Sequence, residues 1–153
     1  MLLGIDASST NTALTFLDEE GNFQSSILLT PNKKLCLEER GTEIVKDVIS
    51  AVAEHTITHA AIEYSSFGSK GRVVDLSALN GGIMYSLLIQ GIPVQKFAPT
   101  SIKKFATDNG RADKDQMASA MPEGILAGYK KDHKKVDDLV DSYFIAKMLH
   151  SKL

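Results

Sequence analysis

Four carboxylate residues of this 153-residue chain occupy positions that core packing does not readily explain. Asp6 and Glu63 each end a short apolar segment, where ligands gather at the carboxyl edge of an α/β sheet. Asp138 and Asp141 are three residues apart and share one face if their segment is a helix. Because a buried carboxylate is costly unless it is paired or bound to a metal, this pattern predicts a cation site.

The donor type indicates which chemistry such a site could perform. Oxygen ligands favour magnesium or manganese over zinc. The single cysteine, Cys36, has no partner in this sequence for a disulfide or a thiolate zinc site. Carboxylates can hold two ions roughly 3.5–4 Å apart and support in-line hydrolysis of a phosphodiester. We therefore expect a nuclease site with Mg²⁺ or Mn²⁺, two ions per active site.

Each acid taken alone also has a structural interpretation. A strand-end acid can cap a loop or pair with a lysine, and acidic clusters are common on exposed helices. Asp137 lies four residues before Asp141 and could replace Asp138, and helical spacing does not choose between them. The metal-site hypothesis therefore depends on all four acids occurring together.

The elements that must position these acids follow from the spacing of apolar residues. Apolar or alternating segments predict five strands, at residues 2–6, 12–17, 23–30, 59–63 and 92–97, of which the first three form an antiparallel meander. Helical spacing predicts helices over 35–54, around 76–88, over 99–106 and around 136–144, with a polar loop over 107–113. We expect a single α/β domain over residues 1–153, with a five-stranded mixed sheet flanked by helices.

Composition is ordinary for a globular protein, with 43% hydrophobic and 24% charged residues. No apolar run approaches the roughly 18 residues needed to span a membrane, and the N-terminal residues do not resemble a signal peptide, so we expect a cytoplasmic location. The net charge of −2 argues mildly against nucleic acid, but basic pairs recur along the chain and could share one face.

These motifs, taken in order, resemble the RuvC-type Holliday-junction resolvases of the ribonuclease H-like superfamily. The similar segments are Gly4-Ile5-Asp6-Ala7-Ser8-Ser9-Thr10-Asn11-Thr12, Ala60-Ala61-Ile62-Glu63, the lysine-bearing stretch from Pro99 to Lys114, and Asp138-Leu139-Val140-Asp141-Ser142. They extend over nearly the whole chain. Ala7, Ala13 and Ser142 depart from the family pattern, in which proline, glycine and alanine are usual, and the segment from Tyr64 to Arg72 is also divergent.

The resemblance implies roles that spacing alone does not assign. It favours Asp138 over Asp137 and places Lys103 and Lys114 on the DNA backbone, where Lys114 would act near the scissile phosphate. It implies that Phe67, or else Tyr64, stacks on unpaired bases, although a buried loop anchor is the alternative for Phe67. The remaining expected DNA-binding residues are Lys70, Arg72, Lys104 and Arg111.

We therefore expect a homodimeric, magnesium-dependent endonuclease that resolves four-way junctions and also cuts other branched DNA. A two-fold substrate calls for two active sites related by a two-fold axis, and the helix carrying Gly81-Gly82 is the expected interface. The alternatives are a ribonuclease H-like nuclease without junction selectivity, an actin-like ATP-binding phosphotransferase lobe, and a junction-binding protein without catalytic activity.

Overall fold

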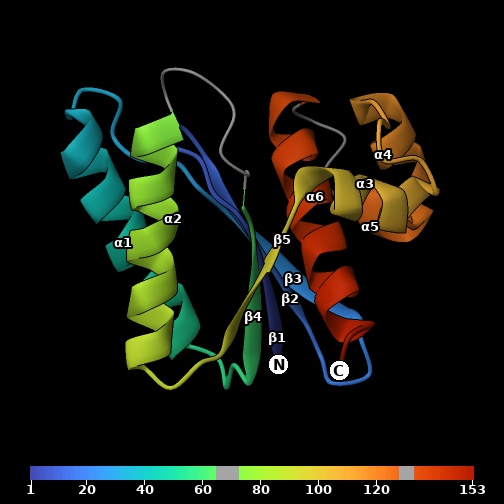
Figure 1. Ribbon diagram of the computed structural model, residues 1–153, viewed down its shortest axis with the longest axis horizontal. Coiled ribbons are helices and arrows are strands. Elements are labelled where there is room, and N and C mark those ends of the chain that lie inside the picture. The colour runs from blue at the N-terminus through green and yellow to red at the C-terminus, as the bar shows by residue number, and fades with distance from the viewer. Residues whose placement is uncertain (65–72, 128–132) are drawn as a thin grey trace.

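The computed structural model describes residues 1–64, 73–127 and 133–153, and its centre is a five-stranded sheet in the order β3-β2-β1-β4-β5 (Figure 1). The strands are Leu2–Asp6 (β1), Thr12–Leu17 (β2), Phe23–Leu29 (β3), His59–Glu63 (β4) and Val94–Phe97 (β5). Strand β2 is antiparallel to both β1 and β3, whereas β4 is parallel to both β1 and β5. The expected five-stranded mixed sheet is confirmed.

Helices cover both faces of this sheet (Figure 1). Leu37–Ala53 (α1) and Val73–Ile89 (α2) lie on one face. The other face carries Pro99–Thr107 (α3), Lys114–Ala120 (α4), Glu123–Ala127 (α5) and the long C-terminal helix His133–His150 (α6). No helix in the described part of the chain is long and apolar enough to cross a membrane.

Two of these helices, α4 and α5, were not predicted. The start of α4 nevertheless carries a sequence signal, because the Asp113 carboxylate accepts a hydrogen bond from the Gln116 amide while the Gln116 side chain accepts one from the Asp113 amide. This reciprocal arrangement satisfies amides that a first helical turn leaves without partners. Both helices are short, so their apolar residues do not complete a readable helical period.

Alternation along the strands divides the apolar side chains between two cores. Leu3 and Ile5 of β1 point toward α1 and α2, whereas Leu2 faces α6. Since successive residues of a strand face opposite sides, Gly4 and Asp6 share the α6 side with Leu2. The first acid of the predicted site therefore projects from the end of β1 toward the C-terminal helix.

Helix α6 lies unusually close to β1 at Gly4. A Cβ atom added there would clash with the Ser142 carbonyl oxygen and would lie 2.5 Å from the Ala146 backbone nitrogen. Both obstacles are backbone atoms, so a side-chain movement cannot relieve the clash. Gly4 therefore sets how closely the acidic helix approaches the strand that carries Asp6.

Replacing Gly4 with alanine should consequently force α6 away from the sheet. We expect Gly4→Ala to lower the free energy of unfolding by about 3 kcal/mol, at the upper end of the cost of overpacking, measured by chemical denaturation. Gly124→Ala is the matched control, because a Cβ there meets no atom within 4 Å. Equal stability of the two variants would contradict this account of the packing.

Candidate active site

Two carboxylates end neighbouring parallel strands at the carboxyl edge of the sheet. In the register of β1 with β4, Ile5 is opposite Ile62, so Asp6 and Glu63 follow one residue later on adjacent strands. Ala61, the residue two before Glu63, faces the α6 core. Glu63 therefore projects to the same side of the sheet as Asp6.

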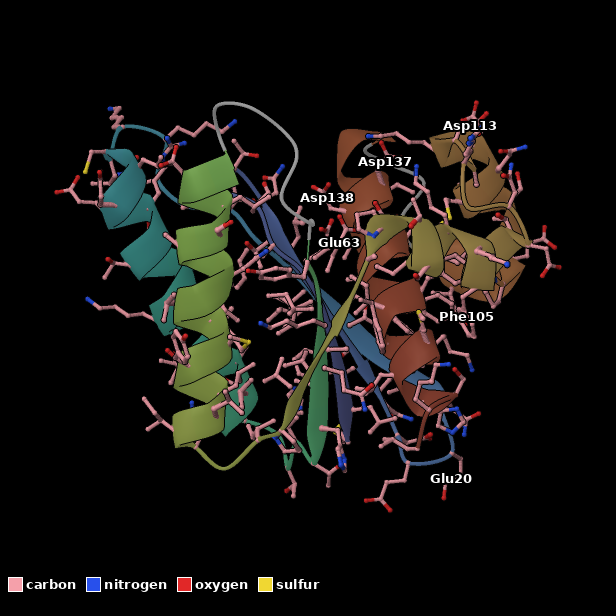
Figure 2. All side chains as sticks on the ribbon, viewed as in Figure 1. Glu20, Glu63, Phe105, Asp113, Asp137 and Asp138 are labelled. Atoms are coloured by element: carbon pink, nitrogen blue, oxygen red, sulfur yellow. The ribbon has the colours of Figure 1, made fainter. Side chains whose placement is uncertain are left out.

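Helix α6 brings two further acids to this edge. Asp138 and Asp141 occupy its N-terminal half, and Figure 2 shows Asp138 and Glu63 close together in the view, between α2 and α6. Both α6 acids, together with Glu63, raise the pKa of Asp6 by charge repulsion. The structure therefore brings together all four acids that the sequence singled out.

Burial and mutual repulsion alter the protonation of these groups. Burial is the main cause that raises the pKa of Asp6 well above its usual value. Burial, followed by repulsion from Asp141, raises the pKa of Glu63 to about 7. Burial, followed by repulsion from Asp138, raises the pKa of Asp141 to about 6. Burial also raises the pKa of Asp138. Ionising the set therefore costs free energy unless cations approach it.

The neighbouring residues Asp137 and Asp138 differ in their surroundings. Asp137 accepts a hydrogen bond of 2.6 Å from the Lys114 ammonium, and this bond raises the pKa of Lys114. Asp138 instead lies near the turn after β1, where the Asn11 side chain favours its ionised form. Asp138 is also among the acids that raise the pKa of Asp6, whereas Asp137 is not. The geometry thus separates two residues that helical spacing leaves equivalent.

Two of the predicted lysines border the acidic cluster. Lys103 on α3 and Lys114 at the start of α4 line a small cavity of about 90 Å³ together with Asp141 and Asp137. The positive charge of Lys103 lowers the pKa of Glu63 and Asp141, and that of Lys114 lowers the pKa of Asp6, Asp138 and Asp141. Lys114 is 76% exposed, so its ammonium group is accessible to a substrate.

The other predicted DNA-binding residues are less closely tied to the acids. Lys104 and Arg111 are exposed, and in the described structure neither forms a salt bridge with an acid. Tyr64 follows β4, and the Lys96 ammonium lies 4.5 Å from the centre of its ring, so one ring face is already in contact with a cation. Phe67, Lys70 and Arg72 lie outside the described residues.

Two asparagines contribute to the site without having been predicted. Asn11 lies near Asp138 and favours its ionised form, as described above. Asn80 on α2 is 4% exposed and donates its side-chain amide to the backbone oxygen of Glu63 at 3.2 Å, which anchors the end of β4. The sequence marks both only as polar residues, one in a turn and one in an otherwise apolar helix, so neither pattern identifies its partner.

The donor set suits a hard divalent cation. Four carboxylates supply oxygen ligands, and the cost of their burial is the cost that a bound cation would offset. Among the described residues, no three Asp, Glu, His or Cys side chains converge closely enough to hold an ion by themselves. Magnesium commonly binds through one or two carboxylates and completes its shell with water and substrate phosphate, so an open arrangement fits this ion.

Comparison with known proteins places this arrangement in context. Residues 2–147 match the family model described as crossover junction endodeoxyribonuclease RuvC. The relative of that name in Afipia carboxidovorans is 31% identical to this chain, and the matched part covers 76% of this chain and 70% of the relative. In a Sulfurovum species, identity is 29% over 95% of this chain and 91% of the relative.

Solved structures show the same fold. RuvC of Thermus thermophilus, in complex with a Holliday junction substrate, superposes with a TM-score of 0.76 at 20% identity, covering 95% of this chain and 90% of that one. The resolvase of fowlpox virus, in complex with a substrate Holliday junction, gives a TM-score of 0.64 at 14% identity over all of both chains.

The raised carboxyl pKa values predict how stability depends on pH when divalent metal is absent. The folded chain binds these protons more tightly than the unfolded chain, so the stability that they contribute should be fully present below about pH 4 and be lost as the pH rises through about 6 and 7, where Asp141 and Glu63 ionise in the folded chain. With EDTA at pH 8, Asp141→Asn should therefore raise the free energy of unfolding by about 2 kcal/mol, measured by denaturation.

Glu20→Gln is the control for that measurement, because Glu20 is exposed in the β2–β3 turn, away from the acidic cluster (Figure 2). It should leave the pH dependence unchanged. If Asp141→Asn were no more stable than the wild type at pH 8, repulsion among the acids would not be a significant cost of folding.

Proposed function

The chain belongs to the RuvC family of crossover junction endodeoxyribonucleases, and we propose that residues 1–153 act as one nuclease domain that resolves four-way DNA junctions with Asp6, Glu63, Asp138 and Asp141 as its metal ligands. The observation that supports the assignment of residues is that these four acids, from β1, β4 and α6, lie at one edge of the sheet, near enough for the other three to act on Asp6 by charge repulsion. The enzyme is a metal-dependent endonuclease, and other branched DNA is a secondary substrate.

The acids serve to bind metal and to orient it. We assign Mg²⁺ or Mn²⁺ to the site, two ions per active site. When bound, such ions supply the charge that activates the attacking water and stabilises the leaving 3′ oxygen. Asn11 favours the ionised form of Asp138, and Asn80 holds the end of β4 that carries Glu63. Residues of this kind keep the ligand geometry constant.

Lys103 and Lys114 are proposed to contact the DNA substrate rather than the metal. Lys114 is exposed and held beside the acids by Asp137, which favours its charged form. Its ammonium group can approach a backbone phosphate at the cleavage position, and Lys103 lies in the same cavity. A positive charge placed there stabilises the negative charge that develops on the phosphate during hydrolysis. Lys104 and Arg111, exposed nearby in sequence, extend the proposed DNA contact.

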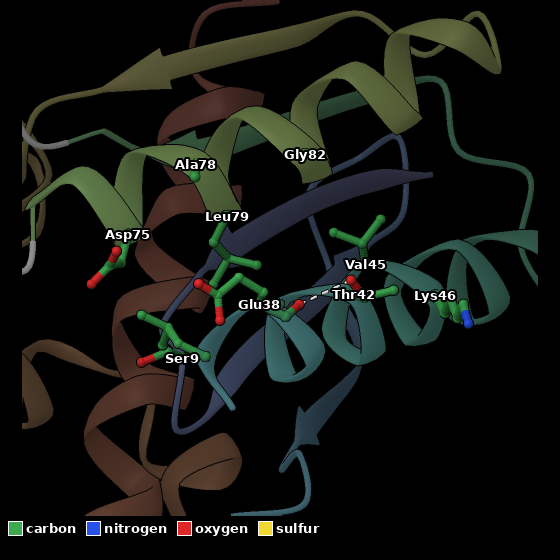
Figure 3. Close-up of a pocket in the computed structure, with 11 residues that line it drawn as sticks. Ser9, Glu38, Thr42, Val45, Lys46, Asp75, Ala78, Leu79 and Gly82 are labelled. Carbon is green, nitrogen blue, oxygen red and sulfur yellow. Dashed lines mark hydrogen bonds between the residues drawn. The ribbon is translucent and has the colours of Figure 1, made fainter. Parts of the chain in front are cut away.

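Cleavage of both strands of a junction requires a second active site, and α2 offers the surface for a homodimer. Tyr85 and Ile89 are 63% and 86% exposed on this helix, an unusual exposure for large apolar side chains. Beside them, Gly82 approaches Val45 of α1, and a cavity of about 530 Å³ opens between α1 and α2 (Figure 3). A second copy of this face, related by a two-fold axis, would cover both features.

The assignment is tested by cleavage of synthetic DNA substrates in magnesium. The wild-type protein should nick opposed strands of a four-way junction and cut forks and flaps more slowly, with little cleavage of linear duplex or RNA–DNA hybrid. Asp6→Asn should lower the junction cleavage rate at least about 100-fold, because loss of a residue that merely supports a metal ligand already costs 10- to 100-fold. Junction binding, measured by gel shift, should persist.

Asp137→Asn provides the matched control, because it makes the same chemical change one residue away from Asp138. It removes only the partner of an exposed lysine, which contributes about 1 kcal/mol or less, so the rate should fall about fivefold or less. Full activity of Asp6→Asn would refute the proposed site. Equal cleavage of all substrates would instead leave a nuclease without junction selectivity.

The proposed dimer makes a separate prediction. Ile89→Glu places a charge on the exposed apolar face, at the C-terminal end of α2, and should convert the dimer to a monomer in sedimentation velocity experiments, with a loss of paired incisions. Leu153→Glu is the control, since Leu153 is a 62% exposed apolar residue at the C-terminus. A dimer that survives both Ile89→Glu and Tyr85→Glu would place the interface elsewhere.

A further inference from the structure

A chain of three hydroxyl groups connects the sheet to the acidic turn of α6. Thr15 of β2 lies with its Oγ1 atom 2.7 Å from Ser26 Oγ on β3 and 2.8 Å from Ser142 Oγ on α6. Thr15 and Ser142 are completely buried. Buried hydroxyl groups are costly unless hydrogen-bonded, and every member of this chain has a partner.

The direction of these hydrogen bonds follows from their last member. Ser142 Oγ lies 3.0 Å from the backbone oxygen of Leu139, which can only accept, so the Ser142 proton is used there. Thr15 must then donate to Ser142, and Ser26 must donate to Thr15. The chain therefore runs in one direction, from the edge strand to a backbone carbonyl of α6.

That carbonyl belongs to the turn of α6 between Asp138 and Asp141. Leu139 directly follows Asp138, and Ser142 directly follows Asp141. On the sheet, Thr15 is the cross-strand partner of Gly4, and both lie on the row that α6 covers. The close contact at Gly4 sets the distance of the helix from the sheet, but a contact with a bare backbone does not fix its rotation or its position along the strand.

We infer that Thr15 and Ser142 are positioning residues that fix the rotation of α6 and thereby hold Asp138 and Asp141 in register with Asp6. Hydrogen bonds are directional, whereas apolar side chains of the same size would fill this space without specifying one rotation. Metal sites need their ligands within about 0.5 Å of the productive geometry, so a small rotation of α6 is sufficient to weaken them. The inference rests on the proposed metal-binding role of these acids.

The test measures metal binding directly and apart from cleavage. Binding of Mn²⁺ to the wild type and to variants is followed by the loss of the free-ion signal in electron paramagnetic resonance, at one pH and one temperature. Thr15→Val keeps the shape of the side chain and removes the hydroxyl. It should raise the dissociation constant about tenfold, the low end of the effect of residues that support metal ligands. Thr15→Ser keeps the hydroxyl and should restore binding to about twofold of the wild type.

Ser142→Ala provides an independent variant, because alanine suits a helix interior and packs in the space of serine. It should weaken Mn²⁺ binding to the same degree as Thr15→Val. The double variant should be no weaker than either single one, since both substitutions remove the same hydrogen bond.

Val48→Ala controls for a general loss of stability. Val48 is buried in the core on the other face of the sheet, against α1 and α2. It should lower the melting temperature at least as much as Thr15→Val while leaving the Mn²⁺ dissociation constant unchanged. If Thr15→Val and Ser142→Ala likewise lower only the melting temperature, the hydroxyl chain is a structural feature and the inference is overturned.

The same titrations separate this inference from the proposed function. A wild-type protein that binds no Mn²⁺ and cleaves no junction would refute the metal site itself. A wild type that binds and cleaves, with variants whose dissociation constants match it, would refute only the positioning role of Thr15 and Ser142.

Discussion

Repulsion among buried carboxylates is the constraint that the rest of this structure must accommodate. Asp6, Glu63 and Asp141 come from three separate elements and lie half-buried near one another, and each therefore ionises less readily than a free carboxyl group. A fold under selection for stability alone would not assemble them. The surrounding elements have to hold the groups together when no cation is present and leave room for a cation and a phosphate.

The packing of α6 meets this requirement through a close backbone contact and through directional hydrogen bonds. At Gly4 the helix approaches β1 without an intervening side chain. The hydroxyl chain through Thr15 connects β2 to the turn of α6 that carries the acids. On the other face, Asn80 ties α2 to the end of β4. The backbone around each acid is thus anchored by groups that carry no charge, which adds nothing to the repulsion.

The sequence predicted the strands of the sheet, and the acids at the ends of two of them, because these signals are local. An apolar segment with an acid at its end can be read within six positions, and β1 and β4 both have this form. The partners of the acids could not be read in this way. Asn11 is 127 residues from Asp138 in the sequence, and Asn80 is 17 residues from Glu63. These contacts depend on how the helices pack. The choice between Asp137 and Asp138 likewise depended on the position of Lys114, 23 residues earlier.

The acidic net charge of the chain is due to the four acids of the proposed site. The formal charge of −2 includes the four acids of the site, so the remaining residues together carry a formal charge of +2. Cations bound at the site would offset the acidic group, and the surface offered to DNA would then be that of a weakly basic protein with Lys103 and Lys114 beside the cleavage position. Without metal, the same acids would repel a phosphate. Metal bound at this site would therefore have two effects on the substrate: it would supply the charge needed for hydrolysis, and it would lower the electrostatic barrier to approach, so that DNA and metal should bind to this edge of the sheet cooperatively.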